Sequence, residues 1–311
     1  MRLQTLAPAK VNLVLRVGPL RPDGFHAIRS LMVPLDLGDE VEVRISPRRG
    51  PVTCRTPGRP ELDGPTNLAA RAAEAFRARF GVDRGVAIRI AKRTPVTAGL
   101  GGGSSDAAAV LRCLARAFAV RDAAAVAELA LGIGSDVPFF LGPGPAWAGG
   151  RGEALTPAEV PPLDLVLVYP RAAALAIRAG DAYRWLDEAR QGRRVPGSGA
   201  GGGPFRPSRV GNDLEPPCTA RHPALRGLLG QLIGAGATVA IMSGSGPTVF
   251  GIFPGRGAAR RAALAIGALA GDGAEVLVAR TARRRPRVTR WRSPRSASSP
   301  STRRSSAPTS R

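Results

Sequence analysis

The sequence predicts an α+β protein with two domains. Its 311 residues are enough for two domains of ordinary size, and a hydrophobic content of 44% supports a real core. Strand-like and helix-like stretches alternate along the chain, which is typical of layered α+β folds. We place the first domain at residues 1–155 and the second at 160–280. A flexible insertion is expected at about 192–209 and a disordered basic tail at 281–311.

Composition excludes several classes of protein. No apolar run approaches the length of about 18 residues that a membrane-spanning helix needs. The first ten residues lack the apolar core of a signal peptide. Cys54, Cys113 and Cys218 are odd in number and widely spaced, so they predict neither a disulfide framework nor a metal site. We therefore expect a cytoplasmic protein without a membrane partner.

The net charge of +22 suggests nucleic acid as a partner. Its distribution weakens this interpretation, because residues 281–311 alone hold ten arginines and no acidic residue. Lys10 and Lys92 are the only lysines, and every other basic residue is arginine. This pattern indicates a compositional bias toward arginine. Nucleic-acid binding through the tail stays an alternative of a different class, but an improbable main function.

The elements of the first domain follow from local patterns. Apolar residues alternate in 7–17, which predicts a strand, and Pro22-Asp23-Gly24 predicts the turn after it. Residues 31–33 and 40–45 predict two further strands, and the Pro, Gly and Arg of 47–65 predict a loop. Thr66-Asn67 caps a helix that runs to Phe80, with apolar residues at every fourth position. A strand is predicted at 86–90.

A glycine-rich stretch, residues 94–106, precedes a helix that we expect to run to Phe118. Ser104, Ser105 and Asp106 favour a helix start, since their oxygens accept N–H groups of a first turn. Glycines let the backbone approach a ligand, and the free N–H groups of a helix N-terminus suit phosphate. The alternative interpretation of residues 94–106 is a flexible linker that precedes the helix. A P-loop is excluded because it needs a lysine after its glycines, and no lysine follows Lys92. A dinucleotide-binding fingerprint is excluded because Ser104 stands at its third glycine position.

The second half alternates in the same way. A helix is predicted at 122–131, a glycine-rich turn around Trp147 at 144–152, a strand at 163–169 and a helix at 183–189. Asn212-Asp-Leu-Glu215 begins a helical region. The remaining predictions are helices at 223–233 and 258–269 and strands at 238–242, 248–253 and 274–279, with Ser243-Gly-Ser-Gly-Pro247 as a tight loop.

Four stretches in this order resemble the GHMP kinase superfamily, a group of small-molecule kinases. They are Pro8-Ala-Lys-Val-Asn-Leu13, Pro95-Val-Thr-Ala-Gly-Leu-Gly-Gly-Gly-Ser-Ser-Asp106, Gly134-Ser-Asp-Val-Pro-Phe139 and Ser243-Gly-Ser-Gly-Pro-Thr248. The resemblance covers roughly residues 1–280. It implies the two-domain GHMP kinase fold, with an N-terminal domain like ribosomal protein S5 domain 2 and a ferredoxin-like C-terminal domain.

The resemblance implies ATP and Mg²⁺ as cofactors. Asn67 would border the adenine pocket, although a simple N-cap is an equal interpretation. Ser105 or Asp106 would hold Mg²⁺, and capping of the helix is as good an interpretation of Asp106. The ATP-binding residues implied are Pro95, Val96, Thr97, Ala98, Gly99, Leu100, Gly101, Gly102, Gly103, Ser104 and Ser105.

The resemblance also assigns the reacting groups. Asp136 would be the general base that takes the proton of an acceptor hydroxyl, in apolar surroundings. Lys10 would be its cationic partner. From the local sequence alone, Asp136 would be interpreted as a turn residue and Lys10 as a solvated surface lysine. The resemblance to the GHMP kinases reverses both interpretations.

The acceptor implied is a small molecule, a methylerythritol linked to cytidine diphosphate, because Arg21-Pro-Asp-Gly-Phe-His26 resembles the turn of one member of the family. Asn12 would bind its alcohol part, Phe25 and His26 its cytosine, and Tyr183 would stack nearby. Phe25 stands where the family has tyrosine, and Arg178-Ala179 stand where it has Ser-Thr, so the acceptor contacts of that segment are in doubt. A kinase of the homoserine or mevalonate type stays an alternative, and we expect a monomer or homodimer.

Overall fold

The computed structural model of the chain describes residues 1–191 and 205–290. Its strands are β1 (Arg2–Leu20), β2 (His26–Arg49), β3 (Val52–Arg55), β4 (Arg84–Ala91), β5 (Ala146–Gly149), β6 (Ala154–Pro157), β7 (Asp164–Pro170), β8 (Gly211–Asn212), β9 (Val239–Met242), β10 (Val249–Phe253), β11 (Ala274–Arg280) and β12 (Thr289–Arg290). Its α-helices are α1 (Leu68–Phe80), α2 (Gly102–Ala117), α3 (Ala123–Ile133), α4 (Val137–Leu141), α5 (Ala179–Arg190), α6 (Glu215–Arg221), α7 (Pro223–Gly234) and α8 (Arg256–Ala270). Short 3-10 turns lie at Pro60–Leu62, Ala173–Leu175, Pro207–Arg209 and Gly271–Gly273.

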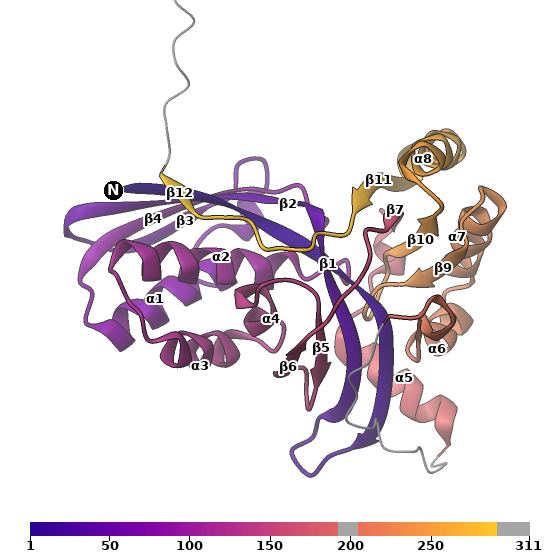
Figure 1. Cartoon of the computed structure of the whole chain (residues 1–311), viewed down its shortest axis with the longest axis horizontal. Coiled ribbons are helices and arrows are strands. Elements are labelled where there is room, and N and C mark those ends of the chain that lie inside the picture. Colours follow the sequence, from indigo (N-terminus) through magenta and orange to yellow (C-terminus); the bar gives the residue numbers. More distant parts are fainter. Residues whose placement is uncertain (192–204, 291–311) are drawn as a thin grey trace, which may run out of the picture.

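The strands form two sheets (Figure 1). The larger sheet has the order β12-β1-β2-β4-β3, with β5 beside β2, β6 beside β5 and β8 beside β1. The smaller sheet is antiparallel, with the order β11-β7-β10-β9. Helices α1, α2 and α3 lie along one face of the larger sheet, and α5 to α8 lie around the smaller one (Figure 1). The two-domain GHMP kinase fold predicted above has this mixed α and β content.

A first core fills the space between the larger sheet and its helices. Phe76 of α1, Leu111 and Leu114 of α2 and Val43 of β2 are all completely buried in it. These side chains recur on one side of each helix and on alternate positions of the strand, as helical and strand periods require. Burial of apolar surface on this scale is what stabilises the layer.

The smaller sheet is covered on both faces. Val166 and Val168 of β7 face the core formed with α5 to α8, whereas Leu165 and Leu167 face a core shared with β1. This explains the nearly continuous apolar run of β7, since a strand covered on both sides has no solvent face.

Strands β1 and β2 connect the two layers. They pair along most of their length, from Arg2 opposite Arg44 to Leu20 opposite His26. Leu15 and Val17, near the end of β1, belong to the core of the C-terminal helices. The middle of β1 therefore lies where the two layers meet, and Lys10 and Asn12 lie there.

Several boundaries differ from the sequence predictions. The two strands expected at 31–33 and 40–45 are one strand, because Pro34, Gly38 and Asp39 pair with β1 on the two sides of a register shift. The loop expected at 47–65 contains β3, which pairs in parallel with β4. The turn expected at 144–152 is the β5–β6 hairpin, with Ala146 opposite Pro157.

The prediction of a disordered tail from residue 281 is wrong for residues 281–290. Thr281 forms a bridge with Leu35, and β12 pairs with the start of β1. Val288 is buried in the first core, and that apolar contact fixes a segment whose composition is otherwise that of a solvated tail. Residues 291–311, and the part of the expected insertion at 192–204, lie outside the described residues.

Within residues 1–191 and 205–290, we find no helix with the length and apolar character to cross a membrane.

Candidate active site

The glycine-rich stretch turns directly into α2. The helix begins at Gly102 with Gly101 as its N-cap, so the start predicted at Ser104–Asp106 is two residues late. Gly101 has φ 69°, a left-handed conformation that glycine adopts without strain. This turn makes Ser104 and Ser105 helical already, and no side chain caps the helix. The first-turn N–H groups and the positive end of the helix dipole thus face outward, an arrangement suited to phosphate.

A cavity of about 370 Å³ lies beside this helix start. It is lined by the loop at 95–99, by the first residues of α2 and by the beginning of α1. Asn67 lines it and also caps α1, since its side-chain oxygen accepts from the Ala69 N–H at 2.9 Å. Both interpretations of Asn67 therefore agree with the geometry.

A buried triad of charges closes the floor of this cavity. Lys92 donates from Nζ to Asp39 at 2.5 Å and to Asp106 at 2.9 Å. Asp39 also accepts from the backbone N–H groups of Arg93 and Thr94. Burial, with the nearby Asp39 charge, raises the pKa of Asp106 to about 8, although Lys92 opposes this rise. Asp106 therefore lies inside α2, where it accepts a hydrogen bond from Lys92, and the expectation that it caps the helix is wrong.

Two buried side-chain oxygens, one of them within this triad, have no hydrogen-bond partner. They are Oδ1 of Asp106 and Oγ of Ser105, both buried. Mg²⁺ prefers oxygen ligands and is often held by one or two carboxylates together with substrate phosphates. Each of these two oxygens is available to such an ion, and Asp106 also lines the cavity, whereas Ser105 does not. Within the described residues no cluster of three or more His, Cys, Asp or Glu offers a complete protein-only metal site.

Lys10 lies directly beneath the glycine-rich loop at residues 95–101, which we call the phosphate loop. Its backbone N–H donates to Leu100 O at 2.9 Å, which ties β1 to the loop. Its buried Nζ donates to Asn12 Oδ1 at 2.6 Å and lies 3.6 Å from Asp136 Oδ2. Asn12 in turn donates to Ser30 Oγ at 2.7 Å, and this hydroxyl donates to Val14 O. A chain of hydrogen bonds therefore fixes the amide that orients the ammonium group.

Asp136 is the N-cap residue of α4. Its side chain is 38% exposed, while that of Lys10 is 6% exposed. The apolar surroundings expected for this carboxylate are therefore only partial: Val137 and Phe139 are buried behind it, and the carboxylate itself faces solvent. A solute can reach it on that side.

The Ser243–Thr248 loop packs against the phosphate loop. Ser243 Oγ donates to Gly99 O at 3.1 Å, and a Cβ added to Gly99 would lie 2.3 Å from Ser243 O. Asn212 holds this second loop through hydrogen bonds from Nδ2 to Met242 O and Gly244 O. Glu215 accepts from the Met242 N–H at 2.7 Å. The Ser243–Thr248 loop thus supports the shape of the phosphate loop.

Of the side chains predicted for the acceptor, His26 and Tyr183 meet at the end of the β1–β2 pair, whereas Asn12 lies beside Lys10 in the middle of β1. The His26 ring stacks on Tyr183 with centroids 5.4 Å apart and lies between Gly18 O and Asp187 Oδ2. Phe25 is 53% exposed, with the Arg151 guanidinium over its ring. Burial, followed by the charge of Asp136, raises the pKa of Tyr183 to about 12.

Comparison with known proteins agrees with this geometry. Residues 67–144 match the model of the GHMP kinases N-terminal domain, and residues 207–271 match that of the GHMP kinases C-terminal domain. A curated 4-diphosphocytidyl-2-C-methyl-D-erythritol kinase of Anaeromyxobacter dehalogenans (strain 2CP-C) is 76% identical, over 99% of this chain and 100% of the relative. The chain belongs to the GHMP kinase family.

More distant relatives of this GHMP kinase carry the same name or the same fold. One from Deinococcus radiodurans is 41% identical over 84% of this chain and 87% of its own, and it is also named 4-diphosphocytidyl-2-C-methyl-D-erythritol kinase. A crystal structure of 4-(cytidine 5'-diphospho)-2C-methyl-D-erythritol kinase has a TM-score of 0.73 at 35% identity, over 89% of this chain and 98% of that chain. A homoserine kinase from Cytophaga hutchinsonii, 20% identical with a TM-score of 0.67 over 93% of this chain and 97% of that one, shows the shared fold.

In this GHMP kinase the predicted site residues fall into two groups. Lys10, Asn12, Asp136 and the phosphate loop meet at one point, and His26 meets Tyr183. Phe25 extends into solvent and contacts neither of these two groups in any interaction that the structure shows. Sequence reasoning missed Asp39, Ser30 and the support that Lys92 gives. Of these three residues, only Lys92 could be noticed in the sequence, because it is one of two lysines in an arginine-rich chain.

Proposed function

We propose that this GHMP kinase transfers the γ-phosphoryl group of ATP to the 2-hydroxyl of 4-diphosphocytidyl-2-C-methyl-D-erythritol, a step of the non-mevalonate route to isoprenoid precursors. The names of relatives that are 76% and 41% identical support the acceptor. The observation that carries the chemistry is the Lys10–Asp136 pair, set directly under a helix-start phosphate loop.

Phosphoryl transfer depends on positioning and charge more than on covalent chemistry. The N–H groups at the start of α2 would bind the phosphates of ATP, and the cavity beside Asn67 would receive the nucleoside. Ser105 Oγ and Asp106 Oδ1 would hold Mg²⁺, which supplies positive charge to the phosphates when it is bound.

Asp136 would accept the proton of the acceptor hydroxyl as its oxygen attacks the γ-phosphorus and the bond to ADP breaks. The half-exposed position of the carboxylate gives the acceptor access. Lys10 is buried and oriented by Asn12, so its charge stays fixed between the carboxylate and the loop. It would offset the negative charge that develops on the phosphoryl group during its transfer.

The acceptor assignment is tested by ATP consumption with a panel of alcohols. We expect turnover with 4-diphosphocytidyl-2-C-methyl-D-erythritol and little with homoserine or mevalonate, and a product phosphate at the 2-position by ³¹P NMR. Equal or higher turnover with homoserine or mevalonate would reject the acceptor and leave the kinase chemistry standing.

Phe25 tests how the cytidine part is held. Phe25→Ala removes an exposed aromatic face, so the KM of the acceptor should rise by about tenfold, the cost of one base-stacking contact. The KM of ATP should not change, because the ATP pocket lies elsewhere. Leu20→Ala, at another exposed apolar position of the same hairpin, is the matched control. An unchanged acceptor KM would remove Phe25 from the acceptor site.

A further inference from the structure

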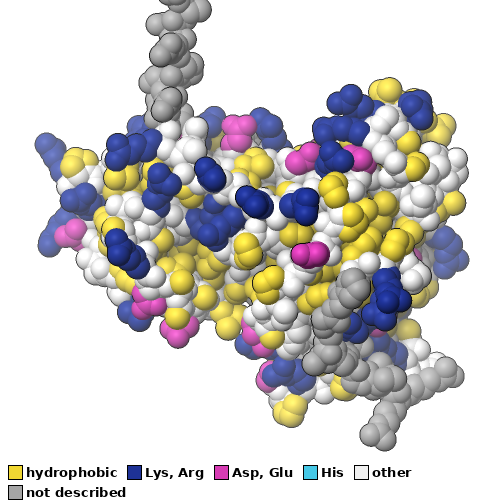
Figure 2. Space-filling model, in the orientation of Figure 1, with side chains coloured by type: hydrophobic (Ala, Val, Ile, Leu, Met, Phe, Trp, Pro, Cys, Tyr) yellow, Lys and Arg dark blue, Asp and Glu magenta, His cyan; other side chains and the backbone are white. Residues whose placement is uncertain are grey.

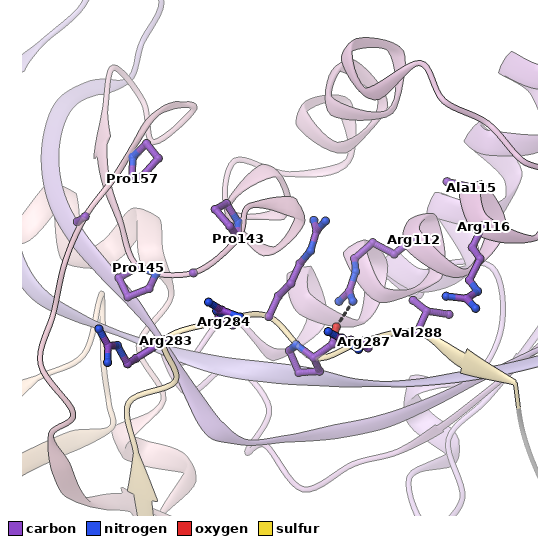
Figure 3. A pocket seen from close by; sticks show the side chains of 14 residues that line it. Arg112, Ala115, Arg116, Pro143, Pro145, Pro157, Arg283, Arg284, Arg287 and Val288 are labelled. Carbon is purple, nitrogen blue, oxygen red and sulfur yellow. Dashed lines mark hydrogen bonds between the residues drawn. The ribbon is translucent and has the colours of Figure 1, made fainter.

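An arginine-lined pocket of about 750 Å³ lies between α2 and the segment that joins β11 to β12 (Figure 3). Its basic residues come from the C-terminal half of α2 and from that segment. They are Arg112, Arg116, Arg283, Arg284, Arg285 and Arg287. On the face shown in Figure 2, basic side chains gather over the same segment.

The arginines of this pocket have no acidic counterpart. None of its lining residues is Asp or Glu, and none of the six arginines forms an ion pair with an acidic side chain within the described residues. Residues 192–204 and 291–311, which the structure does not describe, contain no Asp or Glu at all. Among the described residues, no side-chain carboxylate therefore balances these charges.

Two of the guanidinium groups are held in place by the backbone. Arg112 donates to Pro286 O, and Arg285 donates to Leu141 O. Arg112 is half-buried, and burial, followed by the charge of Arg285, lowers its pKa to about 10. It still carries its charge at neutral pH. A partly desolvated cation next to other cations is costly, and an anion bound among them would remove that cost.

The shape and lining of the pocket favour a small phosphate compound. Guanidinium groups match phosphate oxygens in pairs of parallel hydrogen bonds, and six of them exceed what one phosphate can use. The volume lies within the range of small-molecule sites. Besides arginine, the walls are Pro, Ala, Gly and Val. Among the described residues that line the pocket, none has an aromatic ring on which a base would stack, so RNA is the less favoured ligand.

The pocket is separate from the proposed active site. None of its lining residues lines the cavity beside the phosphate loop. The two sites share only helix α2, whose first turn faces the phosphate loop and whose last two turns carry Arg112 and Arg116.

We propose that this pocket binds a small molecule with two or more linked phosphate groups. The test is calorimetric titration of the full chain with inorganic tripolyphosphate, with ADP present at saturation so that the proposed ATP site is filled. Orthophosphate and a short single-stranded RNA are titrated in parallel.

The deciding variant removes two exposed arginines, Arg284→Gln with Arg287→Gln. The matched control is Arg260→Gln with Arg261→Gln on α8, which removes the same charge from an exposed helix face. Wild type should bind tripolyphosphate at least tenfold more tightly than orthophosphate. The pocket variant should lose about tenfold or more in affinity, as expected when a charge-assisted hydrogen bond is removed. The control should bind as wild type does.

Three results would overturn the proposal. One is no binding of tripolyphosphate. Another is an equal loss of affinity in the pocket variant and the control, which would make the effect one of net charge. The third is RNA that binds through Arg284 and Arg287 and is not displaced by tripolyphosphate, which would assign the surface to nucleic acid.

Discussion

A single buried carboxyl group, Asp106, links the proposed Mg²⁺ site to the charge balance of the fold. It is 3% exposed and accepts a hydrogen bond from Lys92, which also donates to Asp39. Burial is the main reason that its pKa is raised. The same burial leaves one of its oxygens without a hydrogen-bond donor. This unpaired oxygen is available to coordinate a cation.

This raised pKa predicts a fall in stability with rising pH. The pKa of Asp106 rises from 3.8 to about 8 on folding, so between these values the folded chain holds a proton that the unfolded chain has released. Its contribution to stability is present in acid and is lost as the pH rises through about 8. Asp106→Asn cannot titrate, so its Tm should fall less than that of wild type between about pH 5 and pH 8. Glu159→Gln, at an exposed position, is the control, and parallel Tm curves for Asp106→Asn and wild type would contradict the prediction.

Local sequence was sufficient for some site residues and not for others. Lys10 and Asn12 are two residues apart on a strand and so share a face, and Asn67 stands before a clear helical pattern. Asp39 and Lys92 are 53 residues apart, and nothing near either one indicates the other. Ser30 supports Asn12 from the neighbouring strand, a contact set by the register of β1 against β2.

At the scale of elements, the site depends on close packing between the two glycine loops. Gly99 has φ 74°, and a Cβ there would meet Ser243 O at 2.3 Å. Gly58 has φ 79° with nothing within 4 Å of such a Cβ, so it carries the same backbone strain without a clash. Comparing alanine at the two positions separates strain from packing.

We predict that Gly58→Ala lowers the free energy of unfolding by about 1 kcal/mol, the cost of a left-handed alanine. Gly99→Ala should cost a further 1–3 kcal/mol, roughly the cost of overpacking, and should raise the KM of ATP, because the phosphate loop must move. Urea unfolding and steady-state kinetics measure the two effects. If both substitutions had equal effects, the loops would not be packed as described.

Helices were predictable from sequence because their signals are local. Asn67 caps α1 through its side chain, as the pattern indicates, and Asp122, predicted as the first residue of a helix, caps α3 in the same way. The start of α2 was misplaced because Gly101 makes the turn by its backbone alone. Strands were harder to delimit, since β2 continues across residues 34–39 by pairing with β1 at both ends of that stretch, around a register shift that local sequence does not indicate.

At the scale of the whole molecule, the segment at 281–290 joins the two layers. Ala282 donates to Pro34 O, Leu163 donates to Thr281 Oγ1, and β12 extends the larger sheet. The low-complexity composition of residues 281–290 could not reveal that this segment joins the layers. The attachment depends on one buried valine, Val288, and on backbone pairing.

A chain ending at Arg290 should therefore keep the Tm of the full chain. A chain ending at Arg280 loses the burial of Val288 and the bridge to Leu35, so its Tm should fall by about 5 °C or more. Differential scanning calorimetry of both chains tests this. Equal Tm values would mean that the segment contributes nothing to stability.

The central claim is that Asp136, paired with Lys10, takes the proton in ATP-dependent phosphorylation of the cytidine-bearing acceptor. The most direct test is the kcat of Asp136→Asn with that acceptor, with Asp272→Asn at an exposed turn as the control. A positioned general base contributes about 100-fold or more to the rate, so kcat should fall by at least that factor with the KM of ATP unchanged. Turnover of Asp136→Asn close to that of the control would contradict the account.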